Sequence, residues 1–280
     1  FTHSKYVSLK AKDGIVDRFK KKFNGRPNIS IKDPDLIINI HLNDNFCNVS
    51  INSSGSNLNQ RGYRKSTNIA PINEVLASGI IKLTGWNGNS DFLDPMCGSG
   101  TFLIEAALIA GNIPGNLNRN SFAFSKWNDW DLNLFNLIKD YQLKKIKKIN
   151  INIFGYDKSP TAILKAKENI ELANLSLDIK VSKKDFFDSK KKGNNNLHIV
   201  TNPPYGERLK GDINSLYSKI GDSLKLSFSN TDFWFISSNF EAMKYFGLRP
   251  SRKIKLFNGK LESRLMFFPI YEGTKKIHKK

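Results

Sequence analysis

The spacing of apolar residues changes character along the chain. Between residues 10 and 25 apolar side chains recur at helical spacing, and a glycine ends the pattern. Two stretches of alternating apolar and polar residues follow, Leu36–Leu42 and Phe46–Ile51, joined by the three polar residues 43–45. Alternation is typical of a half-buried strand, and a short polar connection is typical of a hairpin. This region therefore predicts a helix followed by a β-hairpin.

A polar, basic stretch separates this hairpin from the rest. Residues 52–71 contain glycines and few apolar side chains, as expected of a linker. The next segment, 71–86, has the apolar spacing of an amphipathic helix, with Pro71 near its start. The sequence therefore predicts a small N-terminal domain, a linker and a larger domain.

From residue 91 onward, strand and helix patterns alternate. The segments are 91–95, 100–111, 151–157, 159–175, 177–185, 198–204, 213–226, 232–238 and 240–247. Such alternation indicates βαβ units and a mostly parallel, doubly wound sheet, so the fold class is α/β. Residues 253–270 depart from it, with two strand patterns around Asn258-Gly259. They predict a C-terminal hairpin that adds an antiparallel pair at the sheet edge.

Composition narrows the class of protein. The chain has 280 residues, 39% of them hydrophobic and 11% aromatic, which indicates a folded globular protein. Cys47 and Cys97 are too few for a disulfide scaffold or a four-cysteine zinc site, and the four histidines lack ligand spacing, so no metal is expected. Neither a membrane helix nor a signal peptide is visible, which favours the cytoplasm. Because the first residue is Phe1, we expect a fragment of a longer protein.

The charge is strongly one-sided. There are 44 Lys+Arg residues against 25 Asp+Glu, a formal net charge of +19. A surface this positive favours binding of a polyanion, most often nucleic acid, because the bound counterions are released. The alternative is a Lys- and Asn-rich composition inherited from an AT-rich genome. Composition alone leaves both open.

The stretch DFLDPMCGSGTFLIEAAL reads as a strand, a glycine-rich turn and a helix. Gly98 and Gly100 allow the backbone to approach a ligand closely, and the helix begins near Thr101. In doubly wound sheets this crevice holds nucleotide-like cofactors. Asp94 ends the strand with a carboxylate, which would repel a pyrophosphate but would suit a cationic amino-acid group. The alternative is a tight turn with a helix cap.

Two further acids follow the next two strand patterns. Asp157 is placed to accept the hydroxyl protons of a ribose. A helix-capping role fits it poorly, since Ser159 is the better-placed cap. Asp185 precedes Phe186 and could accept from an adenine amine while the aromatic ring flanks the base. A solvated loop acid is the alternative for Asp185.

The stretch TNPPYG ends a buried strand pattern. Asn202 offers a side-chain carbonyl, and Pro203 leaves its own carbonyl free. Two converging acceptors can hold both protons of an exocyclic amine, and Tyr205 offers a face on which a base can stack. Pro203 and Pro204 stiffen the loop. The alternative is a rigid turn after a strand.

Together these motifs resemble the class I S-adenosylmethionine-dependent methyltransferases of exocyclic amines. RGYR (61–64), DPMCGSGTFLIEAALIA, NPPYGERL and LFNGKLESRL are in particular similar to the bacterial ribosomal RNA large-subunit methyltransferases K/L. The resemblance is to the L module, which makes N2-methylguanine in 23S rRNA. It implies a Rossmann-like methyltransferase domain over 71–280, a linker over 61–70, and the C-terminal part of an α+β THUMP RNA-binding domain over 1–60. The chain has no room for the second, K module.

The resemblance also implies site residues. The cofactor S-adenosylmethionine would be bound by Asp94, Pro95, Cys97, Gly98, Ser99, Gly100, Thr101, Asp157, Lys158, Asp185, Phe186 and Asn202. The catalytic clamp would be Asn202, Pro203, Pro204 and Tyr205. Substrate RNA would contact Arg61, Tyr63, Arg64, Tyr205 and Arg208, with the Lys144–Lys148 run as further phosphate contacts.

The implied function is N2-methylation of a guanine in 23S rRNA, free or in a large-subunit precursor, by a cytoplasmic monomer. The clamp by itself does not separate guanine N2 from adenine N6, so an N6-adenine methyltransferase of RNA or DNA is one alternative. A non-catalytic RNA-binding assembly factor that kept the fold is the other.

Overall fold

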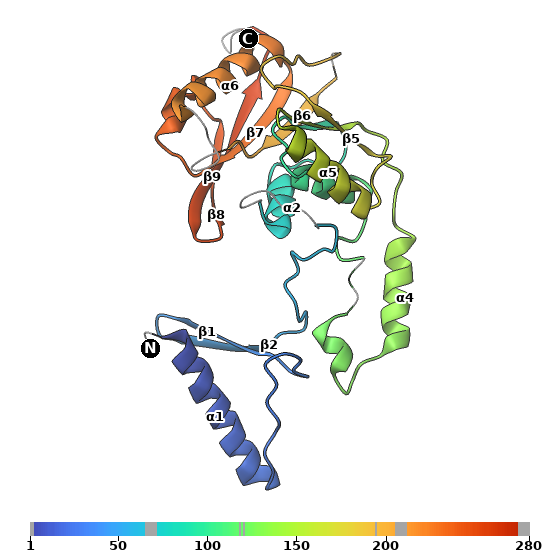
Figure 1. Ribbon diagram of the computed structural model, residues 1–280, viewed down its shortest axis with the longest axis vertical. Coiled ribbons are helices and arrows are strands. Elements are labelled where there is room, and N and C mark those ends of the chain that lie inside the picture. The colour runs from blue at the N-terminus through green and yellow to red at the C-terminus, as the bar shows by residue number, and fades with distance from the viewer. Residues whose placement is uncertain are drawn as a thin grey trace. The chain divides into compact units, whose positions relative to one another are not determined.

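The computed structural model describes residues 3–64, 72–117, 119, 121–193, 195–204 and 212–273. The chain divides into two compact units (Figure 1). One comprises residues 1–57 and 119–137, and the other comprises residues 58–118 and 138–280. The predicted domain limits, 1–60 and 71–280, remain a prediction. The division brings an internal stretch of the larger domain into the first unit.

The first unit contains the predicted helix and hairpin. They are α1 (Ser4–Phe23), β1 (Ile38–Asn43) and β2 (Phe46–Ile51). The helix ends at Phe23, two residues before the expected glycine, because Asn24 takes the left-handed conformation with φ 48°. The turn is also shorter than predicted: Asn43 pairs with Phe46, and Asp44 supplies the positive φ of 51°.

Residues 119–137 also belong to this unit, which the sequence did not indicate. They include the short 3₁₀ helix η1 (Ala123–Lys126) and the start of α4 (Leu132–Leu143). Arg119 Nη2 donates to the carbonyls of Ser54 and Ser56, both at 2.7 Å. These contacts tie the stretch to the polar segment that follows β2.

The second unit is a seven-stranded sheet with helices on both faces (Figure 1). Its strands follow the order β5-β4-β3-β6-β7-β9-β8. Their bounds are β3 Asp91–Asp94, β4 Ile153–Asp157, β5 Ile179–Lys183, β6 Leu197–Thr201, β7 Thr231–Ser237, β8 Arg252–Asn258 and β9 Leu261–Ile270. The helices are α2 Glu74–Leu83, α3 Thr101–Ala110, α5 Pro160–Leu172, α6 Ile213–Ser227 and the 3₁₀ helix η3 Ala242–Phe246.

Strand directions confirm the predicted fold class. Strands β5, β4, β3, β6 and β7 pair in parallel, whereas β9 runs antiparallel to β7 and β8 antiparallel to β9. The C-terminal hairpin thus closes the sheet edge as expected, with Gly259 in its turn at φ 63°. The sheet is a Rossmann-like, mostly parallel one.

Successive side chains of β7 pack into two different core clusters, one on each face of the sheet. Phe233 and Phe235 pack in the cluster that contains α6 and η3. Trp234 and Ile236 pack in the cluster that contains α2, α3 and α5. Because successive side chains of a strand point to opposite faces, the helices cover both sides of the sheet.

Candidate functional site: the carboxyl edge of the sheet

The connections of the sheet change direction between β3 and β6. From β3 the chain moves outward to β4 and β5, then returns to place β6 on the other side of β3. Ligands of open α/β sheets bind at such a switch point, outside the carboxyl ends of the strands. The predicted acids and the first residue of the clamp, Asn202, lie at this edge. Asp94 and Asp157 end β3 and β4, and Asp185 and Asn202 follow β5 and β6.

The glycine-rich loop closes against the end of β4. Gly98 and Gly100 have φ of 54° and 84°, which side chains rarely tolerate. The backbone N–H of Gly98 donates to Asp157 Oδ2 at 3.0 Å, and the N–H of Ser159 donates to Asp157 Oδ1 at 2.8 Å. A Cβ at Gly100 would also lie 3.4 Å from Ala166 Cβ. The loop is therefore shaped by backbone conformation, with Asp157 as its anchor.

Asp94 is a buried acid between the loop and the clamp. Its side chain is 2% exposed, and its Oδ1 accepts from the Thr201 hydroxyl at 2.9 Å and from the Met96 N–H at 3.2 Å. Burial raises the pKa of Asp94 from 3.8 to about 7, a rise that these two hydrogen bonds oppose and the charge of Asp157 supports. A cation placed beside it would stabilise the carboxylate.

The third acid has a local partner. Asp185 Oδ1 accepts from the N–H of Phe187 at 3.0 Å. Phe186, which was predicted to face the cofactor, is buried in the core with its ring 5.0 Å from that of Phe228. Phe187 is only partly buried. In this pair, Phe187 is therefore the ring that has an accessible surface.

The remaining predicted cofactor residues differ in exposure. Pro95, Cys97 and Ser99 are buried, and Lys158 is exposed. Burial raises the pKa of the Cys97 thiol well above its ordinary value, so the thiol is neutral. Cys97 belongs to the apolar core cluster that contains α2, α3 and α5.

Three of the four clamp residues, Asn202, Pro203 and Pro204, lie within the described residues. All five residues of β6 are buried, and the strand leads directly into Asn202. Pro203 is buried, whereas Asn202 and Pro204 are partly exposed. Tyr205 and Arg208 lie outside the described residues. Since Thr201 is bonded to Asp94, the start of the clamp is held next to the end of β3.

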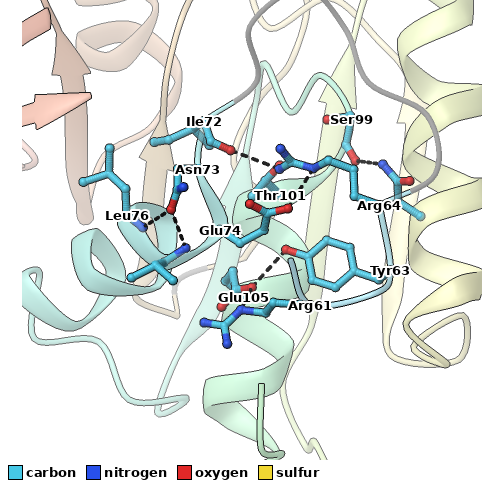
Figure 2. A network of polar contacts seen from close by, with 12 residues as sticks. Arg61, Tyr63, Arg64, Ile72, Asn73, Glu74, Leu76, Ser99, Thr101 and Glu105 are labelled. Carbon is cyan, nitrogen blue, oxygen red and sulfur yellow. Dashed lines mark hydrogen bonds and ion pairs between the residues drawn. The ribbon is translucent and has the colours of Figure 1, made fainter. Parts of the chain in front are cut away.

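The predicted RNA-contact residues 61–64 point inward (Figure 2). Arg61 Nε lies 2.8 Å from Glu105 Oε1, which also accepts from the Tyr63 hydroxyl at 2.9 Å. Arg64 Nε lies 3.1 Å from Glu74 Oε1. These contacts give the segment a structural role within the second unit. An RNA contact by these residues remains a prediction.

The two glutamates were missed by the sequence analysis. Glu105 is 1% exposed on a helix whose other buried residues are apolar or threonine, and burial raises its pKa despite Arg61 beside it. A single acid inside an apolar helix is a detectable signal, because a buried carboxylate needs a partner. Glu74 carried no such signal, since it precedes its apolar run.

Two further kinds of feature are absent from the described part of the chain. Among these residues, no group of three or more His, Cys, Asp and Glu side chains could hold a metal ion. No helix there is both long and apolar enough to cross a membrane.

The edge of the sheet fits a sulfonium nucleoside. A backbone cradle that glycine conformation maintains, a partly exposed carboxylate on β4 and a buried acid on β3 offer hydrogen-bond acceptors and negative charge. Such a donor set suits a ligand with hydroxyl groups and a positive charge.

Comparisons with known proteins agree with this geometry. Residues 61–266 match the family model of the RMKL-like methyltransferase domain, and residues 1–52 match the THUMP domain. The ribosomal RNA large subunit methyltransferase K/L of Cellvibrio japonicus (strain Ueda107) is 39% identical over 96% of this chain. The alignment covers 38% of that protein, so the chain spans less than half its length.

Two crystal structures share the fold. SMU.472, a putative methyltransferase complexed with S-adenosylhomocysteine (SAH), is 31% identical with a TM-score of 0.82, over 94% of this chain and 70% of that one. A predicted N6-adenine-specific DNA methylase from Listeria monocytogenes is 28% identical with a TM-score of 0.79, over 94% and 67%. The chain therefore belongs to the family of RMKL-like methyltransferase domains, preceded by a THUMP domain.

Proposed function

We propose that the whole protein methylates the N2 amine of a guanine in 23S rRNA, with S-adenosylmethionine as methyl donor. The observation that carries the proposal is the pairing of β3 with β6, which sets the acid-rich cofactor edge beside Asn202. The similarity to K/L methyltransferases supports the substrate, and the SAH complex of SMU.472 supports the cofactor.

Each of the three acids would bind a different part of the cofactor. Asp157 would accept the ribose hydroxyls through the lone pairs that its two backbone donors leave free. Asp185 would accept from the adenine amine, with Phe187 available against the ring. Asp94 would face the cationic amino-acid moiety, which favours its ionised form. Bound S-adenosylmethionine supplies an electrophilic methyl group on a positively charged sulfur.

The clamp would orient the amine for direct transfer. The side-chain carbonyl of Asn202 and the backbone carbonyl of Pro203 would accept the two amine protons, and Tyr205 would stack on the base. The amine lone pair forms the new N–C bond while the C–S electrons return to sulfur, and a proton then leaves the nitrogen for solvent. Positioning of the two reactants carries most of the rate.

The remaining assignments belong to the same proposal. Residues 1–60 would act as part of a THUMP domain that binds RNA, and residues 71–280 as the catalytic domain. The matched THUMP model and the net charge of +19 support an RNA partner. The reaction would take place in the cytoplasm, with the protein acting as a monomer.

Adenine N6 is the second candidate acceptor. It is also an exocyclic amine, and the similar structure from Listeria monocytogenes bears the description of an N6-adenine-specific DNA methylase. The acids and Asn202 at one sheet edge argue against a non-catalytic assembly factor.

The acceptor is tested by mass spectrometry of nucleosides from 23S rRNA, with and without the gene. We expect loss of one N2-methylguanine on deletion and its return on complementation. Loss of N6-methyladenine instead would establish the second candidate, and unchanged modification together with no SAH binding would favour the assembly factor.

The clamp is tested with Asn202→Ala. We expect methyl transfer to fall below detection while the SAH dissociation constant stays within about threefold, because the amide holds the acceptor amine. Calorimetric titration of SAH and single-turnover transfer measure the two effects. An equal collapse of SAH binding would mean that Asn202 belongs to the cofactor site.

A further inference from the structure

One guanidinium group joins three separate segments next to the glycine-rich loop (Figure 2). Arg64 Nε pairs with Glu74 Oε1 at the start of α2, at 3.1 Å. Arg64 Nη2 donates to the carbonyl of Ile72 at 3.0 Å and to the hydroxyl of Thr101 at 2.8 Å. Thr101 is the first residue of α3 and directly follows the loop. Arg64 is thus linked to the end of the loop by a charged hydrogen bond.

The loop depends on contacts of this kind. Gly100 precedes α3 without a side chain that could cap the helix, and the local contact that closes this turn is a backbone one, from the N–H of Gly100 to the carbonyl of Cys97 at 2.8 Å. From the other side, the side-chain amide of Asn169 on α5 donates to the carbonyl of Ser99 at 3.0 Å. Ser99 and Thr101, the residues on either side of Gly100, are therefore each held by a side chain from elsewhere in the unit.

We propose that Arg64 is a positioning residue that sets the cofactor loop, and that it does not act by contacting RNA. The proposal rests on the function above, in which residues 94–101 bind S-adenosylmethionine. A planar guanidinium can serve Glu74, Ile72 and Thr101 at once, whereas a lysine ammonium offers one point charge. Arg64 is 15% exposed, and Glu74 already occupies the position of an anionic partner.

The test uses SAH titrations of the full chain in the absence of RNA. Arg64→Lys retains a charge for Glu74, and the double change Arg64→Met with Glu74→Met removes the buried pair without leaving a lone charge. The matched control is Arg61→Met with Glu105→Gln, which removes a similarly buried ion pair at the middle of α3 and keeps an acceptor for the Tyr63 hydroxyl. Asp157→Asn tests the cofactor site itself.

We expect both Arg64 variants to raise the SAH dissociation constant about tenfold, as for the loss of one charged hydrogen bond. Melting temperatures of Arg64→Lys should stay near that of the wild type, and the Arg61 control should keep wild-type SAH affinity. The KM for S-adenosylmethionine should rise with kcat unchanged at saturation. If the double variant does not fold, Arg64→Lys decides alone.

Two results would overturn the proposal. One is wild-type SAH affinity in Arg64→Lys. The other is an unchanged SAH dissociation constant in the double variant Arg64→Met with Glu74→Met, combined with a slope of log RNA affinity against log salt that is smaller by about one, as expected when the protein neutralises one phosphate fewer. If Asp157→Asn also left SAH binding unchanged, the proposed cofactor site would be wrong as well, so the two failures are distinguishable.

Discussion

At the level of single residues, Asp94 shows how the site departs from ordinary packing. Its carboxyl group is buried, accepts two hydrogen bonds, and has its pKa raised by burial to about 7. The protein therefore holds an acid in a place that disfavours its charge, at the point where a cationic cofactor group is proposed. Such local conflicts are expected at functional sites.

The burial of Asp94 predicts that Asp94→Asn raises the free energy of unfolding by an amount that depends on pH. The folded pKa of about 7 exceeds the unfolded value of 3.8, so folded protein retains a proton that the unfolded chain releases between these values. Rising pH through this window therefore destabilises the wild type. Without cofactor, we expect the asparagine variant to be more stable by roughly 1–3 kcal/mol at pH 8, with no gain near pH 4.

Urea unfolding at the two pH values measures this difference. Asparagine retains an oxygen that can accept from Thr201, so the comparison isolates the charge. A gain of equal size at pH 4 and pH 8, or a loss at pH 8, would contradict the assignment of a raised pKa.

At the level of helices and strands, packing requires glycine at one position and merely accepts it at another. A Cβ at Gly221 of α6 would lie 1.8 Å from the carbonyl oxygen of Phe246 in η3. A Cβ at Gly79 of α2 would meet nothing within 4 Å. Neither residue has a positive φ, so space alone distinguishes them.

These two glycines form a matched pair of substitutions. We expect Gly221→Ala to lower the free energy of unfolding by about 1–3 kcal/mol, because η3 must move away. We expect Gly79→Ala to raise it by about 0.5–1 kcal/mol through helix propensity. Chemical denaturation of both variants checks the signs. Similar effects in the two would show that α6 does not pack against η3 as described.

For the protein as a whole, the excess of positive charge has a measurable consequence. The lysines of the Lys144–Lys148 run are exposed, and the net charge is +19. Binding of each phosphate releases counterions, so RNA affinity should fall steeply with salt. RNA binding by this run is an expectation from the sequence.

Replacing Lys144, Lys145, Lys147 and Lys148 by glutamine tests this surface. If the run binds RNA, the slope of log affinity against log salt should fall by about one for each phosphate that is no longer neutralised, while SAH affinity is unchanged. The control replaces Arg252, Lys253, Lys255 and Lys260 on the β8–β9 hairpin, which are also exposed, with Lys255 paired to Glu262. An equal reduction in both would reflect overall charge and not a specific RNA surface.

Much of the architecture was readable from local patterns. The alternation of strand and helix, the Ser159 cap of α5 and the hairpin at Gly259 were confirmed, because periodicity, caps and turns depend on neighbours in sequence. Other features could not be predicted from local patterns. The 3₁₀ form of η3, the two-residue turn at Asp44 and the helix α4 differ from or exceed the predictions. In α4 the apolar residues Leu134, Leu137, Ile138 and Tyr141 recur at helical spacing, although none of the residues of the helix is buried.

Local sequence specifies which chemical groups this protein carries at the ends of its strands, since each acid and the Asn-Pro-Pro run follow a recognisable pattern. Only the tertiary structure decides which of these groups contact one another. Pairing of β3 with β6 sets Thr201 against Asp94, and folding turns Arg61 and Arg64 toward Glu105 and Glu74. Contacts between residues far apart in the chain follow from strand order and helix packing, and no local pattern encodes them.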